Sequence, residues 1–325
     1  MVRRAAAVSG VRAACHVLIV ALLPGCSSPD TPAEPLATAR TPIAYGTADT
    51  THTAVVAVLS LVGSSSLQEC SGSLVQVTST TGYVLTAAHC CNTHVPTIVV
   101  ASSDYTVGES YLLGGTPSPP VYSVVPGSVF YDAQYTGADH DFCMLKIAGA
   151  AAHMATLALP TSSGDGLALN EPIEHVGFGI TDANATNSGR RTGSDTLDQE
   201  LTSLVFEFSQ GGANHIPGTC DGDSGGPSLV PAGAAQSQQT VVGVQSFGNA
   251  SSCAQETLGG ASRVSSEIGA GRFITSYLAG SPIGVQAGGT GSAPPAPAGG
   301  PWALAGLALA LIAASARARR ADRPA

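Results

Sequence analysis

Short apolar runs separated by turn-forming residues dominate the middle of the chain. Runs rich in Val, Leu and Ile, such as those in "YVLTAAHC" and "FCMLKI", lie between clusters of Gly, Ser, Thr and Pro. This pattern predicts many short strands rather than long helices. We therefore expect an all-β body across residues 43–280.

Composition narrows the range of partners. Only 11% of the 325 residues are charged, and the net charge is −9. Phosphate binding needs clustered Lys and Arg, which the body lacks, so nucleic acid is not expected as a partner. No cofactor or metal is expected either, because the run from Cys90 to His94 has no second group of metal ligands in the sequence.

Both ends of the chain carry targeting features. Residues 1–25 combine early arginines with an apolar run of signal-peptide length, which predicts export. The stretch "LPGC" resembles a bacterial lipobox, so Cys26 is either lipidated or simply follows a cleavage site. Residues 26–42 would be a linker or propeptide.

The C-terminal end also carries features of membrane or surface attachment. A Gly/Pro/Ala-rich linker, residues 281–300, precedes a hydrophobic segment, 301–316, and a basic tail, 317–325. This order resembles a bacterial Gly-Gly surface-sorting signal, and a plain tail anchor is the alternative. As a helix, the fifteen residues from Trp302 to Ala316 would span about 22 Å, less than the roughly 30 Å hydrocarbon core. We expect a protein of the bacterial cell envelope or cell surface. It would be attached to a membrane through an N-terminal lipid or through the C-terminal segment, or it would be released.

Three local motifs carry candidate chemistry. "YVLTAAHC" places His89 after an apolar run, "ADHDFCMLKI" places Asp141 at the head of another, and "GDSGGP" places Ser224 in a glycine-rich turn. A serine becomes a nucleophile when a base takes its proton and a third group orients that base. The other histidines, among them His52, His140 and His175, lack such a motif and are interpreted as surface or core residues.

With these motifs in the order His, Asp, Ser, the region resembles the chymotrypsin/trypsin family of serine endopeptidases. The resemblance implies two six-stranded antiparallel β-barrels, with a C-terminal helix at "GRFITSYL". It also implies peptide hydrolysis through an acyl-enzyme, with His89 as base, Asp141 as its orienter and Ser224 as nucleophile. Peptides or proteins would be the substrates. A catalytically inactive binding or adhesion module and an esterase with the same triad are the alternatives.

The resemblance assigns further positions around the triad. The backbone N–H groups of Gly222 and Ser224 would form the oxyanion hole. Ser246, Phe247 and Gly248 would pair with an extended substrate, and the Ser246 hydroxyl would support Asp141. Ile43 would be the new N-terminus after activation, with its ammonium on Asp223.

The expected primary specificity follows from a missing carboxylate. Gly218 stands at the base of the pocket, where an aspartate marks the Arg/Lys-specific members of the family. Gly248 and Gly259 match the wall positions. We therefore expect a pocket open to a bulky apolar side chain, with neutral rather than Arg/Lys specificity.

The cysteines of the body fit an exported protein. The resemblance implies Cys70–Cys90 and Cys220–Cys253 disulfides. Cys91 and Cys143 each lie two residues beyond a triad residue, and residues two apart on a strand share a face. They either pair with each other or leave a buried free thiol at Cys143, and we favour the pair.

Overall fold

The computed structural model describes residues 43–63, 66–112, 119–150, 152–161, 164–180, 189–230, 239–248, 253, 255 and 257–288. These belong to one compact unit that spans Arg40–Ala325. The expected signal peptide, Cys26, the sorting tail and most of the linker lie outside the described residues. In the described part of the chain, no helix is long and apolar enough to cross a membrane.

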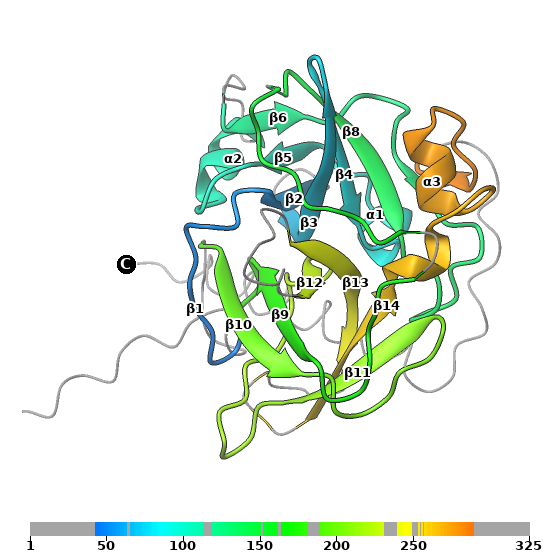
Figure 1. The fold of residues 1–325 in the computed structure, drawn as a ribbon. Coiled ribbons are helices and arrows are strands. Elements are labelled where there is room, and N and C mark those ends of the chain that lie inside the picture. Colours follow the sequence, from blue (N-terminus) through cyan, green and yellow to red (C-terminus); the bar gives the residue numbers. More distant parts are fainter. Residues whose placement is uncertain are drawn as a thin grey trace, which may run out of the picture. The chain divides into compact units, whose positions relative to one another are not determined.

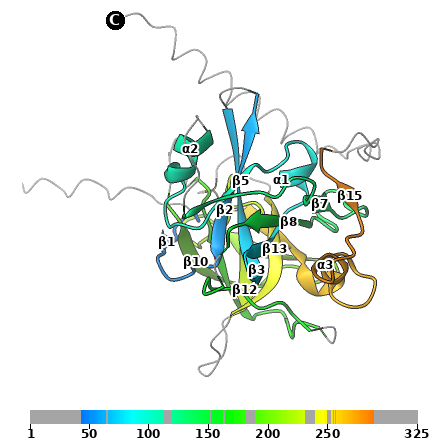
Figure 2. The ribbon, with the colours of Figure 1, turned by 90° about the horizontal axis from the view of Figure 1, so that it is seen from above.

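The first of two antiparallel sheets contains His89 and Asp141 at its strand ends. Its strands follow the order β15-β7-β8-β4-β3-β2-β5-β6. Figure 1 labels the strands from β8 to β6, and Figure 2 labels β7 and β15. Their bounds are β2 Val55–Val62, β3 Ser66–Thr78, β4 Thr81–Thr86, β5 Ile98–Val100, β6 Val121–Ser123, β7 Phe130–Tyr131, β8 Cys143–Ala148 and β15 Val285–Gln286.

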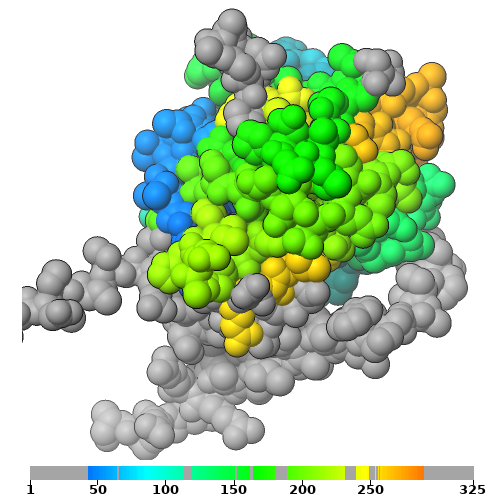
Figure 3. Space-filling view, turned by 60° about the horizontal axis from the view of Figure 1, so that its bottom comes forward, coloured from blue at the N-terminus to red at the C-terminus, as the bar shows by residue number. Residues whose placement is uncertain are grey.

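The second sheet contains the strands on both sides of Ser224, in the order β1-β10-β9-β12-β13-β14-β11. Their bounds are β1 Thr47–Ala48, β9 Pro172–Gly177, β10 Arg191–Thr196, β11 Val205–Gln210, β12 Pro227–Val230, β13 Thr240–Gly248 and β14 Thr257–Arg263. Figure 3 shows the side of this sheet where green to yellow-green segments form much of the surface.

The all-β class is confirmed, but the expected six strands in each sheet are wrong in number. Within the described ranges the sheets have eight and seven strands. The two-residue strands β1 and β15 account for part of the difference, because they add to sheet edges as the chain enters and leaves the domain.

Strand burial follows from the apolar pattern. The first six residues of β2 are all buried, which is typical of a strand packed on both faces. In β11 burial alternates, so Phe206, Phe208 and Gln210 share the inward face. Gln210 is thus a polar residue on a face that otherwise packs into the core.

Helices are few and short. They are α1 His89–Asn92, α2 Thr106–Leu112, the 3₁₀ helix η1 Val264–Glu267 and α3 Phe273–Leu278. The expected C-terminal helix is present as α3, which buries Phe273, Ile274 and Tyr277. After α3 the chain returns to the first sheet, where β15 pairs with β7 (Figure 2).

Candidate active site

The pairing of β4 with β8 brings His89 and Asp141 together. Thr86 at the end of β4 pairs with Cys143 at the start of β8, so the segments that carry the two residues leave the sheet side by side. His89 Nδ1 lies 2.7 Å from Asp141 Oδ2, and the His89 backbone N–H donates to Oδ1 at 2.9 Å. Both carboxylate oxygens therefore hold the histidine segment.

The environment of this pair sets the basicity of the imidazole. The Asp141 side chain is fully buried, whereas that of His89 is 29% exposed. Burial by itself lowers the pKa of His89, but the charge and hydrogen bond of Asp141 outweigh it and raise the pKa above its ordinary value. The pair thus favours proton uptake by His89.

The turn that carries Ser224 packs against the first sheet. The N–H of Ser71, in β3, donates to the Ser224 carbonyl at 2.8 Å, and this oxygen lies 3.7 Å from Cys90 Sγ. Gly225 has φ +84°, and a Cβ there would lie 2.0 Å from Thr86 Oγ1. Only glycine allows this approach, which places Ser224 beside the residue that follows His89.

Two backbone donors flank the serine. Gly222 has φ +94°, and a Cβ there would meet Gly179 Cα at 2.8 Å. No hydrogen bond joins the N–H of Gly222 or of Ser224 to another residue in the described part of the chain. These two N–H groups are the ones expected to form the oxyanion hole.

Ser246 and the residues after it form an open strand edge. A bulge at Ser246 interrupts the pairing of β13 with β14, and its hydroxyl donates to Asp141 Oδ2 at 2.6 Å. The pairing of β13 with β12 ends at Val244, so in the described ranges Phe247 and Gly248 pair only with β14. This edge is the one expected to pair with an extended peptide.

The base of the expected specificity pocket contains a side chain that the sequence did not point to. A Cβ at Gly218 would lie 2.3 Å from Gln210 Cβ, and a Cβ at Gly259 would lie 2.4 Å from Gln210 Oε1. Gln210 Nε2 donates to the Thr219 carbonyl at 3.0 Å, and Oε1 accepts the Thr219 N–H at 2.9 Å. Gln210 therefore lies in the space that side chains at positions 218 and 259 would otherwise enter, and the expected preference for a bulky apolar side chain stays a prediction.

The expected activation residues lie on neighbouring segments. Ile43 is fully buried, and the N–H of Gly218 donates to the carbonyl of Ala44 at 3.0 Å. Asp223 is also fully buried and accepts the N–H groups of Gly179 and Cys220. Burial raises the pKa of Asp223 to about 7, although those N–H groups lower it. The residues before Ile43 lie outside the described part, so its role as a new N-terminus stays a prediction.

Glu69 is a second residue that sequence reasoning missed. Its Cδ lies 3.7 Å from where a Gly222 Cβ would stand, and its Oε1 is buried without a hydrogen-bond partner among the described residues. Burial raises the pKa of Glu69 well above its ordinary value, and the Asp223 charge adds to this while Tyr105 opposes it. Burial therefore disfavours a negative charge on Glu69 beside the expected oxyanion site.

Three disulfides surround the site. They join Cys70 to Cys90, Cys91 to Cys143 and Cys220 to Cys253. The first two attach the two residues that follow His89 to strands: Cys90 to β3 and Cys91 to β8. The third links the Ser224 turn to the segment after β13.

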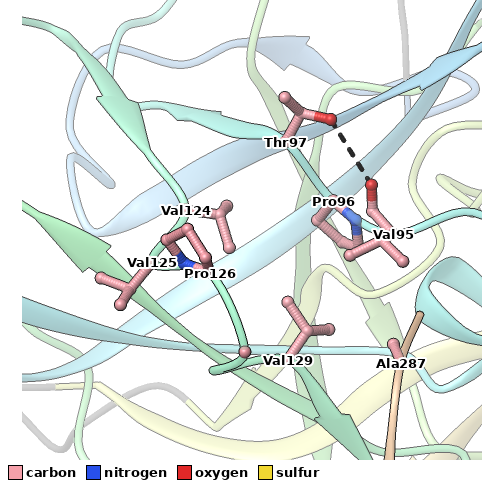
Figure 4. A pocket seen from close by; sticks show the side chains of 9 residues that line it. Val95, Pro96, Thr97, Val124, Val125, Pro126, Val129 and Ala287 are labelled. Atoms are coloured by element: carbon pink, nitrogen blue, oxygen red, sulfur yellow. Dashed lines mark hydrogen bonds between the residues drawn. The ribbon is translucent and has the colours of Figure 1, made fainter. Parts of the chain in front are cut away.

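A separate hollow is lined mostly by apolar side chains from residues 95–97, 124–127, Val129 and Ala287 (Figure 4). None of the triad residues lines it. It was not expected from the sequence, because its walls come from three distant segments.

Residues 44–268 match the family model described as Trypsin. The chain belongs to the trypsin family. This membership supports a serine protease with a His/Asp/Ser triad and with peptide or protein substrates. A search of curated proteins found no match.

Proposed function

We propose that this trypsin-family chain is an active, exported serine endopeptidase that cleaves after small uncharged side chains. The observation that carries the activity is the 2.7 Å contact between His89 Nδ1 and Asp141 Oδ2, with the Ser224 turn docked beside Cys90. An inactive relative used only for binding would not need this arrangement.

The proposed mechanism is acyl transfer, which the trypsin-family match and the His89–Asp141 contact support. His89 takes the hydroxyl proton of Ser224 as Oγ bonds to the peptide carbonyl carbon, and the N–H groups of Gly222 and Ser224 stabilise the negative oxygen. The protonated His89 then gives its proton to the leaving amine as the C–N bond breaks. Water hydrolyses the resulting ester by the same steps in reverse order. Asp141 keeps the imidazole oriented and stabilises its charged form.

The specificity proposal rests on Gln210. Its amide is uncharged, and both polar atoms are bound to Thr219, so Gln210 offers no charge that would attract Arg or Lys. It also shortens the pocket beneath Gly218 and Gly259. A small neutral side chain fits the remaining space without leaving the amide unpaired.

Activation by cleavage before Ile43 belongs to the same proposal. Asp223 has no cationic partner within the part of the chain that the structure describes. A new ammonium would provide one, because the Ala44–Gly218 bridge holds this segment beside the residues that precede Asp223. The ion pair would fix the turn that presents the Gly222 N–H.

Export is proposed from the apolar run at residues 13–23, and the three disulfides support it because such bonds persist in oxidising compartments. Lipidation of Cys26, tail processing and attachment to the cell envelope remain proposals from the sequence. Intact-mass and N-terminal analysis of the natural protein tests these points together with cleavage at Ile43.

The activity is tested with a fluorophosphonate probe and a peptide library on the processed protein. Ser224→Ala should abolish labelling and lower turnover roughly 10⁴-fold or more, and His89→Ala should lower turnover similarly. Ser103→Ala, at an exposed serine, is the matched control and should change neither. Equal labelling of the Ser224→Ala variant would contradict the proposed nucleophile. A majority of cuts after Arg or Lys would contradict the proposed specificity.

A further inference from the structure

A cluster of three potential metal ligands lies next to the triad but takes no part in the proposed reaction. Asp132 follows β7, His140 directly precedes Asp141, and Glu267 ends η1. His140 Nδ1 lies 2.8 Å from Glu267 Oε1 and 3.7 Å from Asp132 Oδ2. One ligand atom from each residue falls within 4.8 Å of the other two.

The Asp132 carboxylate has an unused oxygen that faces this cluster. The Asp132 side chain is only 6% exposed. Oδ1 accepts the Gln134 N–H at 2.9 Å, whereas Oδ2 has no hydrogen-bond partner among the described residues. A buried carboxylate oxygen without a donor is costly, and a cation is one way to compensate it.

Glu267 shows the same division between its two oxygens. Oε2 accepts the Phe273 N–H at 3.0 Å, which leaves Oε1 turned toward His140. Backbone N–H groups therefore hold one oxygen of each carboxylate and orient the other into the cluster. Such outer hydrogen bonds are typical of residues that ligate a metal.

The two carboxylates also favour a cation, because buried carboxylates side by side repel each other unless a positive charge lies between them. A divalent ion bound by both would supply two such charges.

The ligand set distinguishes between metals. Zinc takes His nitrogen and carboxylate oxygen at about 2.0–2.2 Å, so two of its ligands stand roughly 3.3 Å apart across a tetrahedral angle. The observed separations of 2.8 and 3.7 Å lie on either side of this value. Calcium would need six to eight oxygens, and the cluster offers two carboxylates and a nitrogen.

We propose that Asp132 Oδ2, His140 Nδ1 and Glu267 Oε1 bind a zinc ion, with water as the fourth ligand. The His140 side chain is 12% exposed, the most of the three, so solvent reaches the cluster at its ring. The ion would be structural. It would tie the segment beside Asp141 to η1, and the Asp132 N–H already donates to the Phe142 carbonyl on the other side of Asp141.

Zinc binding is measured on the full chain in the Ser224→Ala background, which avoids self-digestion. Isothermal titration with zinc alone should show one equivalent bound through this cluster, and zinc should raise the thermal midpoint. Asp132→Asn and Glu267→Gln should each weaken this binding more than tenfold and remove the thermal shift. Far-UV circular dichroism without metal verifies that each variant folds.

Glu174→Gln is the matched control, because Glu174 is also a partly buried carboxylate beside a histidine, His52. Asp49 faces Nδ1 of His52, whereas Glu174 faces Nε2. The two carboxylates therefore cannot bind one metal ion together with a single nitrogen of His52. This variant should bind zinc like the parent. The proposal is overturned if the parent binds no zinc, if Asp132→Asn and Glu267→Gln both keep the parental affinity, or if calcium binds these residues more tightly than zinc does.

Discussion

The hydroxyl of Ser246 donates a 2.6 Å hydrogen bond to Oδ2 of Asp141, the same oxygen that faces His89. Ser246 comes from the second sheet, whereas Asp141 and His89 come from the first. The buried carboxylate is thus fixed by both sheets, and with it the orientation of the imidazole.

The pH dependence of activity should report this arrangement. His89 must be neutral to accept a proton, and Asp141 raises its pKa above the ordinary 6.5. We expect kcat/KM to rise with pH through a value above 6.5. In the Ser224→Ala protein, NMR titration should give the same His89 pKa. Asp141→Asn should lower it below 6.5, because burial then acts without the opposing charge. An acidic limb below 6.5 in the wild type would contradict this account.

Replacing Gln210 should change the primary specificity. Gln210→Glu places a carboxylate beneath Gly218 and Gly259, so cleavage after Arg or Lys should increase at least tenfold relative to neutral residues. Gln210→Met has similar size and no charge, and it should keep the neutral preference. A peptide-library digest of the wild type and of the two variants measures the fraction of cuts after Arg or Lys and after neutral residues. An unchanged Arg and Lys fraction in Gln210→Glu would show that this side chain does not face the substrate.

Removing the Cys91–Cys143 disulfide should lower the free energy of unfolding and loosen the positioning of the catalytic base His89. The bond closes a loop between residues separated by 52 positions. The Cys91→Ala/Cys143→Ala double variant should lose on the order of 2–4 kcal/mol of unfolding free energy, measured by denaturant titration in the Ser224→Ala background. With Ser224 restored, kcat should fall because His89 and Asp141 lose a covalent link between their segments. Unchanged stability and kcat would contradict this role.

Stability should also fall at alkaline pH because of His52. Burial lowers its pKa, but hydrogen bonds to Asp49 and Glu174 raise it to about 9 in the folded protein. Since the folded-state value exceeds the unfolded value near 6.5, this contribution is fully present below pH 6.5 and is lost as the pH rises through 9. His52→Gln should flatten the decline between these values, as measured by urea unfolding of Ser224→Ala proteins. If the unfolding free energies of the parent and the His52→Gln variant change with pH in parallel, the assigned role of His52 is wrong.

The triad motifs were visible in the sequence because each combines a reactive residue with its local backbone. Gly222 and Gly225 adopt positive φ and approach neighbouring backbone or side-chain atoms too closely for a Cβ. Such requirements restrict the sequence around Ser224 to a recognisable pattern. The strand pattern gave the all-β class for a similar reason, since burial follows local apolar periodicity.

The remaining site features depend on contacts between distant strands. Gln210 precedes Gly218 in a stretch without a motif, and its position beneath Gly259 follows from the pairing of β11 with β14. The cluster of Asp132, His140 and Glu267 likewise has no regular spacing, because η1 meets the Asp141 segment only in the folded protein. His140, interpreted from the sequence as an unremarkable histidine, lies in this cluster.

The division of the triad between two sheets has a consequence during synthesis. His89 and Asp141 belong to the part of the chain that leaves the ribosome first, and the Ser224 turn forms only when β9, β12 and β13 follow. N-terminal units generally fold first during translation. A nascent or truncated chain that ends before Ser224 would therefore have His89 and Asp141 but neither the nucleophile nor the Ser246 hydroxyl that holds Asp141, and it could not digest itself or its neighbours.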